Sequence, residues 1–310
     1  MIIDKDGTLL FKWLFIGNKK FSEPFFDETI SSCLSFQENS SMPFTTAGTL
    51  LQMAESVEPV KPSAFIFHIS RCGSTLLSQM LCIDESIVVL SEVPLLDDLL
   101  RISFSDKNKN IPDAEKLFCA VLTILAQKRN GKEKHLFIKT DSWHLMFFER
   151  IRKLFPSIPA LILYRAPAEV IRSQQKRTGM HAVQGPILPE IFGFSNEQIK
   201  ELLPDNYFEL VLEAYFRKCL SILKTDYHTK AISYHDGPMK IFQDTIRFCN
   251  LTINPEMIAE MEKRTTHHSK YPGEKFSPEI PVVKELTSTF AEELFGKLDE
   301  MKKREKLQSS

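Results

Sequence analysis

Residues 65–77 combine an apolar run, a turn of small residues and a cation, a combination suited to hold an anion. They read Phe-Ile-Phe-His-Ile-Ser-Arg-Cys-Gly-Ser-Thr-Leu-Leu. Gly73 permits close approach of the backbone, and the amides of the turn and of the following helix start point toward an incoming phosphate. Ser74 and Thr75 add hydroxyl donors, and Arg71 adds a fixed positive charge. We expect a phosphate-binding loop here, with an ordinary strand-to-helix turn as the alternative.

This loop differs from the loop of nucleoside triphosphatases, which reads Gly-x-x-x-x-Gly-Lys-Ser/Thr. His68 stands at the position of the first glycine, and Ser74 stands at the position of the lysine. The sequence therefore argues against hydrolysis of ATP or GTP.

A second pair of polar residues follows another apolar run. Arg165 comes directly after Leu-Ile-Leu-Tyr, and Ser173 lies eight residues later. Pro167 suits the first turn of a helix. Because two helical turns separate Pro167 from Ser173, a ligand shared by Arg165 and Ser173 must lie alongside the helix start. Taken alone, Arg165 would be interpreted as part of a surface salt bridge, and Ser173 as a solvated helix residue.

Two carboxylates also stand at the ends of apolar runs. Glu92 follows Val-Val-Leu-Ser, and Asp141 follows Leu-Phe-Ile-Lys-Thr. Open α/β sheets bind ligands at the carboxyl ends of their strands, so both residues are candidates for a general base. We take Glu92 as the first choice and Asp141 as the reserve. Alternatively, Glu92 is a carboxylate that only stabilises the start of a helix. His144, three residues after Asp141, is expected to be packed or solvated rather than catalytic.

The N-terminus carries a different acidic motif. The stretch Ile-Ile-Asp-Lys-Asp-Gly-Thr-Leu-Leu, with Asp4 and Asp6, matches the nucleophile motif of haloacid-dehalogenase-like phosphatases. Only three residues precede Asp4, which is too few for the long strand that this motif ends. No later Gly-Asp-x-x-x-Asp is present to hold magnesium with it. We therefore expect the match to be a coincidence.

The elements that must position these residues alternate along the chain. Short apolar runs, each followed by a segment of helical length, lie at residues 64–69, 87–90, 136–139, 160–164 and 231–234. Residues 206–224 keep apolar spacings of three and four, which predicts a long helix with one apolar face. Strands that alternate with helices predict an α/β fold with a parallel sheet.

Three parts follow from this pattern. Residues 1–60 lack the alternation and form an expected N-terminal appendage, and residues 61–280 form the α/β domain. Residues 281–310 are rich in Glu and Lys, with a single apolar stripe, and predict a solvated C-terminal helical tail.

Composition limits the partners and the compartment. The net charge of −1 provides no overall field for nucleic acid. The apolar runs are too short to span a membrane, and charges at residues 4–6 exclude a signal peptide. Six cysteines are scattered singly, which indicates reduced thiols rather than disulfides or zinc ligands. We expect a cytoplasmic protein with no metal. The cysteines are Cys33, Cys72, Cys82, Cys119, Cys219 and Cys249.

The two cationic motifs resemble those of one family. The stretch 71–76 resembles the 5′-phosphosulfate loop of the sulfotransferase family, in which Lys or Arg precedes Ser-Gly-Thr-Thr; Cys72 and Ser74 depart from that pattern, and Leu76 ends the stretch. Arg165 and Ser173 resemble the family's 3′-phosphate motif, with the same spacing. The resemblance covers roughly residues 62–276 and is closest to small bacterial-type sulfotransferases.

The resemblance implies a P-loop-like parallel sheet flanked by helices, and 3′-phosphoadenosine 5′-phosphosulfate as co-substrate. It assigns to Arg71 a contact with the oxygen that leaves with the phosphate. Glu92 is similar in position to the catalytic Glu of tyrosylprotein and heparan sulfotransferases, and Asp141 lies where the cytosolic enzymes carry a catalytic His. Lys270 and Gly273 resemble the Lys/Gly-rich loop that closes over the nucleotide, although the Gly-Asp-Trp-Lys core is absent.

We therefore expect a sulfotransferase that acts on a hydroxyl or amine of a small-molecule or glycan acceptor. Two alternatives stay open: a small-molecule kinase or another P-loop nucleotide transferase, and a non-catalytic module that binds the nucleotide. The identity of the acceptor and the oligomeric state are not readable from the sequence.

Overall fold

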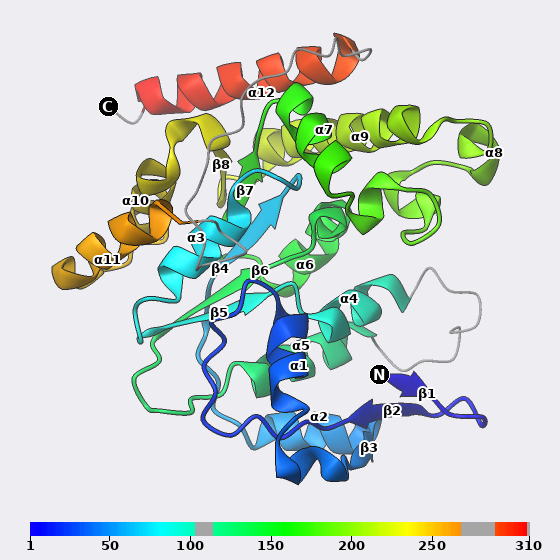
Figure 1. The fold of residues 1–310 in the computed structure, drawn as a ribbon, viewed down its shortest axis with the longest axis vertical. Helices are drawn as coiled ribbons and strands as arrows, with labels where there is room; N and C mark the ends of the chain where they lie inside the picture. Colours follow the sequence, from blue (N-terminus) through cyan, green and yellow to red (C-terminus); the bar gives the residue numbers. More distant parts are fainter. Residues whose placement is uncertain (103–113, 268–288, 309–310) are drawn as a thin grey trace.

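The computed structural model describes residues 1–102, 114–267 and 289–308. Figure 1 shows a central sheet surrounded by helices, with a small second sheet near the N-terminus. The five central strands are parallel and pair in the order β5-β6-β4-β7-β8, so the predicted α/β fold is confirmed. Their bounds are β4 (Pro62–His68), β5 (Ile87–Ser91), β6 (His135–Lys139), β7 (Ala160–Tyr164) and β8 (Thr229–Ser233).

The central strands are mostly apolar and do not alternate apolar with polar side chains, because both faces of the sheet are covered. Every residue of β5 and β7 is buried. A half-exposed sheet would instead alternate apolar and polar side chains. The last strand ends one residue earlier than expected. Ser233 Oγ accepts a hydrogen bond from the His235 amide at 3.3 Å, and this bond starts the short 3₁₀ turn η7 (Tyr234–Asp236).

Helices connect the strands and fill the space around the sheet. The predicted helix at 206–224 is confirmed as part of α9, and its apolar face is buried. Among the described residues, no helix has the length and apolar character needed to cross a membrane. The helices that follow the first strand of the sheet are α3 (Ser74–Leu81), α4 (Pro94–Arg101), α5 (Ala114–Leu125), α6 (Phe148–Leu154), α7 (Pro167–Lys176), α8 (Asn196–Ile199), α9 (Pro204–Thr225), α10 (Pro238–Phe248), α11 (Pro255–Thr265) and α12 (Thr289–Gln308), with 3₁₀ turns η4 (Ser142–Phe147), η5 (Met180–Ala182) and η6 (Pro189–Phe192).

The first 60 residues form an antiparallel sheet and two helices. The sheet has the order β1-β2-β3, and Phe11 and Phe21 bury their rings in the same apolar core as the central sheet. Asp4 lies in the exposed turn between β1 and β2, where its carbonyl accepts the Gly7 amide at 2.9 Å. The phosphatase motif would require Asp4 at the end of a central strand, and this hairpin turn is not such a position. The structure therefore agrees with our expectation that the match is a coincidence. The elements are β1 (Ile2–Ile3), β2 (Leu9–Lys12), α1 (Phe26–Cys33), η1 (Gln37–Ser40), β3 (Phe44–Thr46) and α2 (Ala47–Glu55).

The C-terminal helix α12 docks on the domain rather than standing apart. It packs against α9 and lies across α7 in Figure 1. Leu294 and Leu298 of the predicted apolar stripe are buried. Tyr164 at the end of β7 donates to Asp299 at 2.9 Å, and Glu292 accepts the Ala168 amide at 3.1 Å. The helix thus covers the carboxyl end of β7.

Candidate functional site

The turn after β4 has an unusual backbone. The φ angle is 73° at Ser70, 51° at Arg71 and 83° at Gly73. This left-handed region costs a non-glycine residue about 1 kcal/mol or more. Gly73 is also needed for space, because a Cβ atom there would lie 3.2 Å from the Tyr234 ring. The turn is therefore a strained and closely packed loop at the start of α3, the position expected of a phosphate loop.

Buried hydrogen bonds hold this loop against β7. The Ile69 amide and the Cys72 thiol both donate to the carbonyl oxygen of Leu163, at 3.1 and 3.2 Å. Burial raises the pKa of the Cys72 thiol to about 12. The thiol therefore stays protonated at neutral pH, and Cys72 anchors the loop instead of acting as a nucleophile.

His68 ties the same loop to β6. Its Nδ1 accepts the Ser70 amide at 3.1 Å, which leaves the proton on Nε2, and Nε2 lies 2.9 Å from the carbonyl oxygen of Thr140. Burial lowers the pKa of His68 in spite of a hydrogen bond to Glu92. The ring is thus a neutral structural bridge between two strand ends.

The two cationic motifs meet at this loop. Arg165 Nη1 donates to the carbonyl oxygen of Arg71 at 3.1 Å, and Arg71 Nη2 donates to the carbonyl oxygen of Arg177. The Arg165 guanidinium also lies over the Tyr234 ring, 4.1 Å from its centre. Arg71 and Arg165 are 94 residues apart in the chain. The structure therefore brings the two predicted phosphate-binding arginines into one site.

Helix α7 supplies a carboxylate to the same place. Glu169 accepts from Arg165 Nε at 2.7 Å and lies 3.0 Å from His235 Nε2. Burial raises the pKa of Glu169, but its hydrogen bonds to Arg165 and His235 outweigh burial and lower it. Ser173 is half-buried one helical turn after Glu169, on the same face of α7. Any anion that binds Arg165 and Ser173 must therefore share Arg165 with Glu169.

Glu92 forms an ion pair inside the protein. Its carboxylate contacts Nζ of Lys139, whose side chain is 0% exposed, and lies 3.5 Å from His68 Nε2. Burial alone would raise the pKa of Glu92, but attraction to Lys139 and the contact with His68 lower it to about 2. Glu92 is therefore ionised over the whole physiological range and has little affinity for a proton.

Asp141 has the opposite character. It lies at the end of β6, beside β5 in the sheet, and Oδ2 is 3.7 Å from His144 Nε2. Burial raises its pKa well above the usual range, repulsion from Glu92 and Asp97 adds to the rise, and Lys139 opposes it. Asp141 consequently binds a proton more tightly than an ordinary aspartate does.

Asp97 completes a polar cluster next to Asp141. It accepts hydrogen bonds from Trp143 Nε1 at 2.6 Å, His144 Nε2 at 2.8 Å and Arg101 Nη1 at 3.1 Å. Asp97, Asp141 and His144 offer ligand atoms within 4.8 Å of one another, which is metal-binding spacing. A cation would first have to displace the two N–H donors on Asp97 Oδ1. His144 thus supports Asp97, in line with its expected packing role.

The remaining predicted residues divide into two groups. Ser74, Thr75 and Leu76 form the first turn of α3, with Ser74 buried and the other two half-buried. Lys270 and Gly273 lie outside the described residues.

Sequence reasoning missed three residues that the structure places at the site. Lys139 pairs with Glu92, Tyr234 contacts Gly73, and Gln174 donates to Ser70 Oγ at 3.0 Å. Tyr234 was detectable, because it is the last residue of the fifth apolar run. Lys139 is a lysine inside an apolar run, which also marks a buried charge that needs a partner. Nothing local marks Gln174.

No protein-family model and no curated protein matches the sequence. Solved structures do match. The sulfotransferase STF9 from Mycobacterium avium is 14% identical, covers 82% of this chain and 81% of its own, and superposes with a TM-score of 0.51. The sulfotransferase domain from the curacin biosynthetic pathway is 16% identical, with 78% and 99% covered and a TM-score of 0.48. The mouse sulfotransferase SULT7A1, complexed with PAP, is 14% identical, with 72% and 71% covered and a TM-score of 0.40.

The chain has the sulfotransferase fold. The resemblance inferred from two short motifs is thereby confirmed at the level of architecture. At 14% identity, a shared fold does not define an activity.

Proposed function

We propose that this chain is a sulfotransferase that uses 3′-phosphoadenosine 5′-phosphosulfate. The meeting of Arg71 and Arg165 beside a strained loop carries the proposal, since Arg165 Nη1 lies 3.1 Å from the Arg71 carbonyl oxygen. Two fixed cations at the carboxyl ends of β4 and β7 suit a ligand with two separate anionic groups. This co-substrate has two such groups, a 5′-phosphosulfate and a 3′-phosphate.

The loop and the two arginines take different parts of the nucleotide in this proposal. Gly73, Ser74 and Thr75 cradle the 5′-phosphate with backbone and hydroxyl donors. Arg165 and Ser173 bind the 3′-phosphate, and Arg165 then exchanges part of its pairing with Glu169 for the ligand. Lys270 and Gly273 remain candidates for closing over the nucleotide.

The chemical step is an in-line transfer. An oxygen or nitrogen of the acceptor forms a bond to sulfur while the bond from sulfur to the bridging phosphate oxygen breaks. The proton of the acceptor goes to a carboxylate, and adenosine 3′,5′-bisphosphate leaves. Arg71 donates to the leaving oxygen, where negative charge develops in the transition state.

We propose a different base from our first choice, because the environments of the two carboxylates differ. A general base works best when its pKa lies near the working pH. The pKa of Glu92 is lowered to about 2 by Lys139, whereas burial raises that of Asp141. We therefore assign proton removal to Asp141 and give Glu92 the task of holding Lys139 in place.

In this proposal the acceptor of the sulfuryl group is a hydroxyl or amine of a small molecule or glycan. We retain the cytoplasm as the expected compartment. No metal takes part in the proposed step.

Thermal melting with a set of nucleotides tests the co-substrate. Adenosine 3′,5′-bisphosphate should raise the melting temperature, and AMP, which lacks the 3′-phosphate, should raise it much less. An Arg165→Ala variant should lose the difference between these two nucleotides. Equal shifts with AMP and the bisphosphate would reject the 3′-phosphate site, and a larger shift with ATP or GTP would favour a kinase or another nucleotide transferase.

A further inference from the structure

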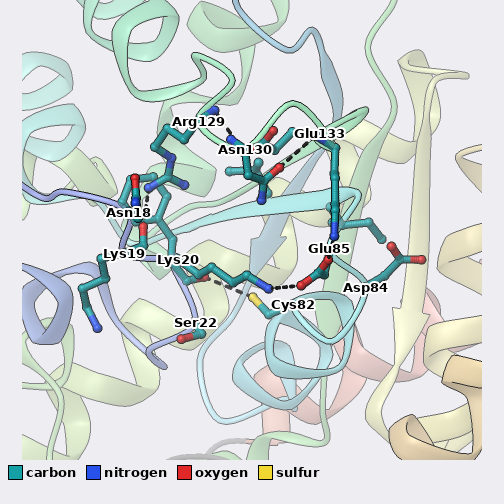
Figure 2. Close-up of a pocket in the computed structure, with 14 residues that line it drawn as sticks. Asn18, Lys19, Lys20, Ser22, Cys82, Asp84, Glu85, Arg129, Asn130 and Glu133 are labelled. Carbon is teal, nitrogen blue, oxygen red and sulfur yellow. Dashed lines mark hydrogen bonds and ion pairs between the residues drawn. The ribbon is translucent and has the colours of Figure 1, made fainter.

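Two places outside the predicted motifs bring distant segments of the chain together. One is a cavity of about 420 Å³ beside the start of β5, lined by residues 18–22, by residues between 82 and 88, and by residues 129–133. Figure 2 shows that Lys20 in its lining reaches to Glu85, and the cavity shares no residue with the proposed nucleotide site. The other is the face of α12 that packs on the domain (Figure 1), and its contacts lead to the proposed nucleotide site.

A buried lysine lies on the docking face of α12. Lys302 forms an ion pair with Asp236, and the two side chains are only 8% and 13% exposed. Withdrawing an ammonium group from water costs free energy, whereas Leu294 and Leu298 already dock the helix through apolar contacts. Docking alone does not need a buried charge, and the pair instead ties α12 to one defined partner, Asp236.

Asp236 belongs to the turn η7, whose two other residues face the nucleotide site. The ring of Tyr234 lies beneath the Arg165 guanidinium, 4.1 Å from ring centre to guanidinium carbon. His235 Nε2 lies 3.0 Å from a carboxylate oxygen of Glu169, and the same oxygen accepts from Arg165 Nε at 2.7 Å. Three consecutive residues therefore connect α12 with Arg165.

The turn η7 is short and depends on contacts with other elements. Its backbone closes one hydrogen bond, from the Gly237 amide to the Tyr234 carbonyl oxygen at 3.2 Å. Gly237 has a φ of 81° and separates the turn from α10, so the helix does not continue through it. Phe295 of α12 adds a ring contact with His235, at 6.4 Å between centres. The position of η7 is thus set largely by what its side chains contact, Lys302 among them.

Helix α12 also contacts two other elements beside Arg165. Asp299 accepts from the hydroxyl of Tyr164, which directly precedes Arg165 at the end of β7, at 2.9 Å. Glu292 accepts the amide of Ala168, in the first turn of α7, at 3.1 Å. The helix therefore contacts β7, α7 and η7, which are three of the elements that carry or contact Arg165.

We propose that Lys302 is a positioning residue for the binding of a 3′-phosphate by Arg165. Lys302 holds Asp236 and thereby keeps η7 in place, and the other two residues of η7 keep the guanidinium in one orientation. A cation that is already oriented loses less conformational entropy when it binds an anion. The inference rests on the proposed function, because it assumes that Arg165 binds the 3′-phosphate of the nucleotide.

Calorimetric titration of the full chain with two nucleotides tests the proposal. Adenosine 3′,5′-bisphosphate carries the 3′-phosphate and AMP lacks it, so the ratio of their dissociation constants measures the contribution of that group. We expect the wild-type protein to bind the bisphosphate at least about tenfold more tightly than AMP. Lys302→Met should reduce this ratio to about threefold or less.

The affinity for AMP should change by less than about twofold in Lys302→Met. The loop proposed to hold the 5′-phosphate has its own anchors in His68 and Cys72, which do not involve η7. A variant that is merely less folded would lose affinity for both nucleotides by the same factor, and the ratio would stay at the wild-type value.

Three further variants complete the test. Lys297→Met is the matched control, because Lys297 is exposed on the same helix and pairs with Glu293 of α12 itself, so the ratio should not change. Lys302→Arg keeps the charge and should retain most of the ratio. His235→Ala removes the next contact toward Arg165 and should also lower the ratio. Because His235 is exposed, this variant tests the proposal even where Lys302→Met does not fold.

The outcomes separate this inference from the proposed function. Equal binding of the two nucleotides by the wild-type protein would reject the 3′-phosphate site itself, and the role of Lys302 with it. A wild-type preference for the bisphosphate that persists in full in Lys302→Met, or in His235→Ala, would reject only the positioning role. Equal losses of affinity for both nucleotides in Lys302→Met would mean that the ion pair only stabilises the fold.

Discussion

The carboxyl edge of the central sheet has two halves that treat charge differently. Around β4 and β7, Arg71 donates to a carbonyl oxygen, while Arg165 contacts a second carbonyl, the Tyr234 ring and Glu169. Around β5 and β6, the charges cancel inside the protein, because buried Lys139 pairs with Glu92.

The difference shows what each half is able to do. An arginine stays protonated whatever it contacts, so the first half offers two fixed cations to an anionic ligand. A buried ion pair has no net charge, but it shifts the pKa of groups beside it. The first half is therefore suited to bind and the second to set proton affinity.

The cation that should matter most is Arg71. We expect Arg71→Ala to lower kcat about 10²–10³-fold, because the leaving oxygen loses its donor. Affinity for the product bisphosphate should fall by only about tenfold. Release of the bisphosphate from the sulfuryl donor, with a screened acceptor mixture, gives the rate, and calorimetry gives the affinity. Arg247→Ala, an exposed arginine on α10, controls for loss of one charge. Equal losses in rate and affinity would reduce Arg71 to a phosphate anchor.

In the half around β5 and β6, Asp141→Asn should lower kcat about a hundredfold. Nucleotide affinity should hardly change, because Asp141 belongs to neither of the two motifs proposed to bind the nucleotide. The raised pKa of Asp141 also predicts an acidic limb of the wild-type pH–rate profile above the usual range for an aspartate. If Glu92→Gln is inactive while Asp141→Asn still turns over, our original assignment of Glu92 as base is the right one.

Replacing Glu92 should also affect stability. Glu92→Gln leaves Lys139 buried without its partner and should cost about 3 kcal/mol of unfolding free energy at neutral pH, since a pKa of about 2 lies below the unfolded value of about 4.3. Because the pKa of Glu92 is lower in the folded than in the unfolded chain, its ionised form stabilises the fold when the pH is above the unfolded pKa. This stabilisation is lost as the pH falls toward about 2.

The difference between wild type and Glu92→Gln should therefore shrink in urea titrations below about pH 5. Glu85→Gln is the exposed counterpart, because two lysines lower the pKa of Glu85 to about 2 as well. Its effect should be smaller, since water screens the pair. A loss in Glu85→Gln as large as that in Glu92→Gln would contradict the role of burial.

The smallest effect should come from Cys72→Ser. The hydroxyl can replace the thiol as donor to Leu163, so kcat should stay within about threefold of wild type. With the thiol pKa raised to about 12, iodoacetamide should leave Cys72 unmodified in the folded protein. Rapid alkylation of Cys72 in the native state would show that the loop opens readily.

Local patterns were enough to predict much of this molecule from sequence. The five strands, the turn at Gly73 and the helix at 206–224 depend on near neighbours along the chain, so apolar periodicity and small residues indicate them. The candidate residues Arg71, Arg165, Glu92 and Asp141 were found because each stands at the end of an apolar run.

Only the tertiary structure decided what those residues contact. Lys139 meets Glu92 because β6 pairs with β5, and Tyr234 reaches Gly73 because β8 follows β7 in the sheet. Periodicity along a chain does not state strand order, and a pKa depends on burial and on charges that arrive from other strands. The cavity lined by residues 18–22, 82–88 and 129–133 likewise needs three distant segments in one place. Sequence alone therefore determined which side chains stand at the strand ends, and the packing of the sheet decided their charge states.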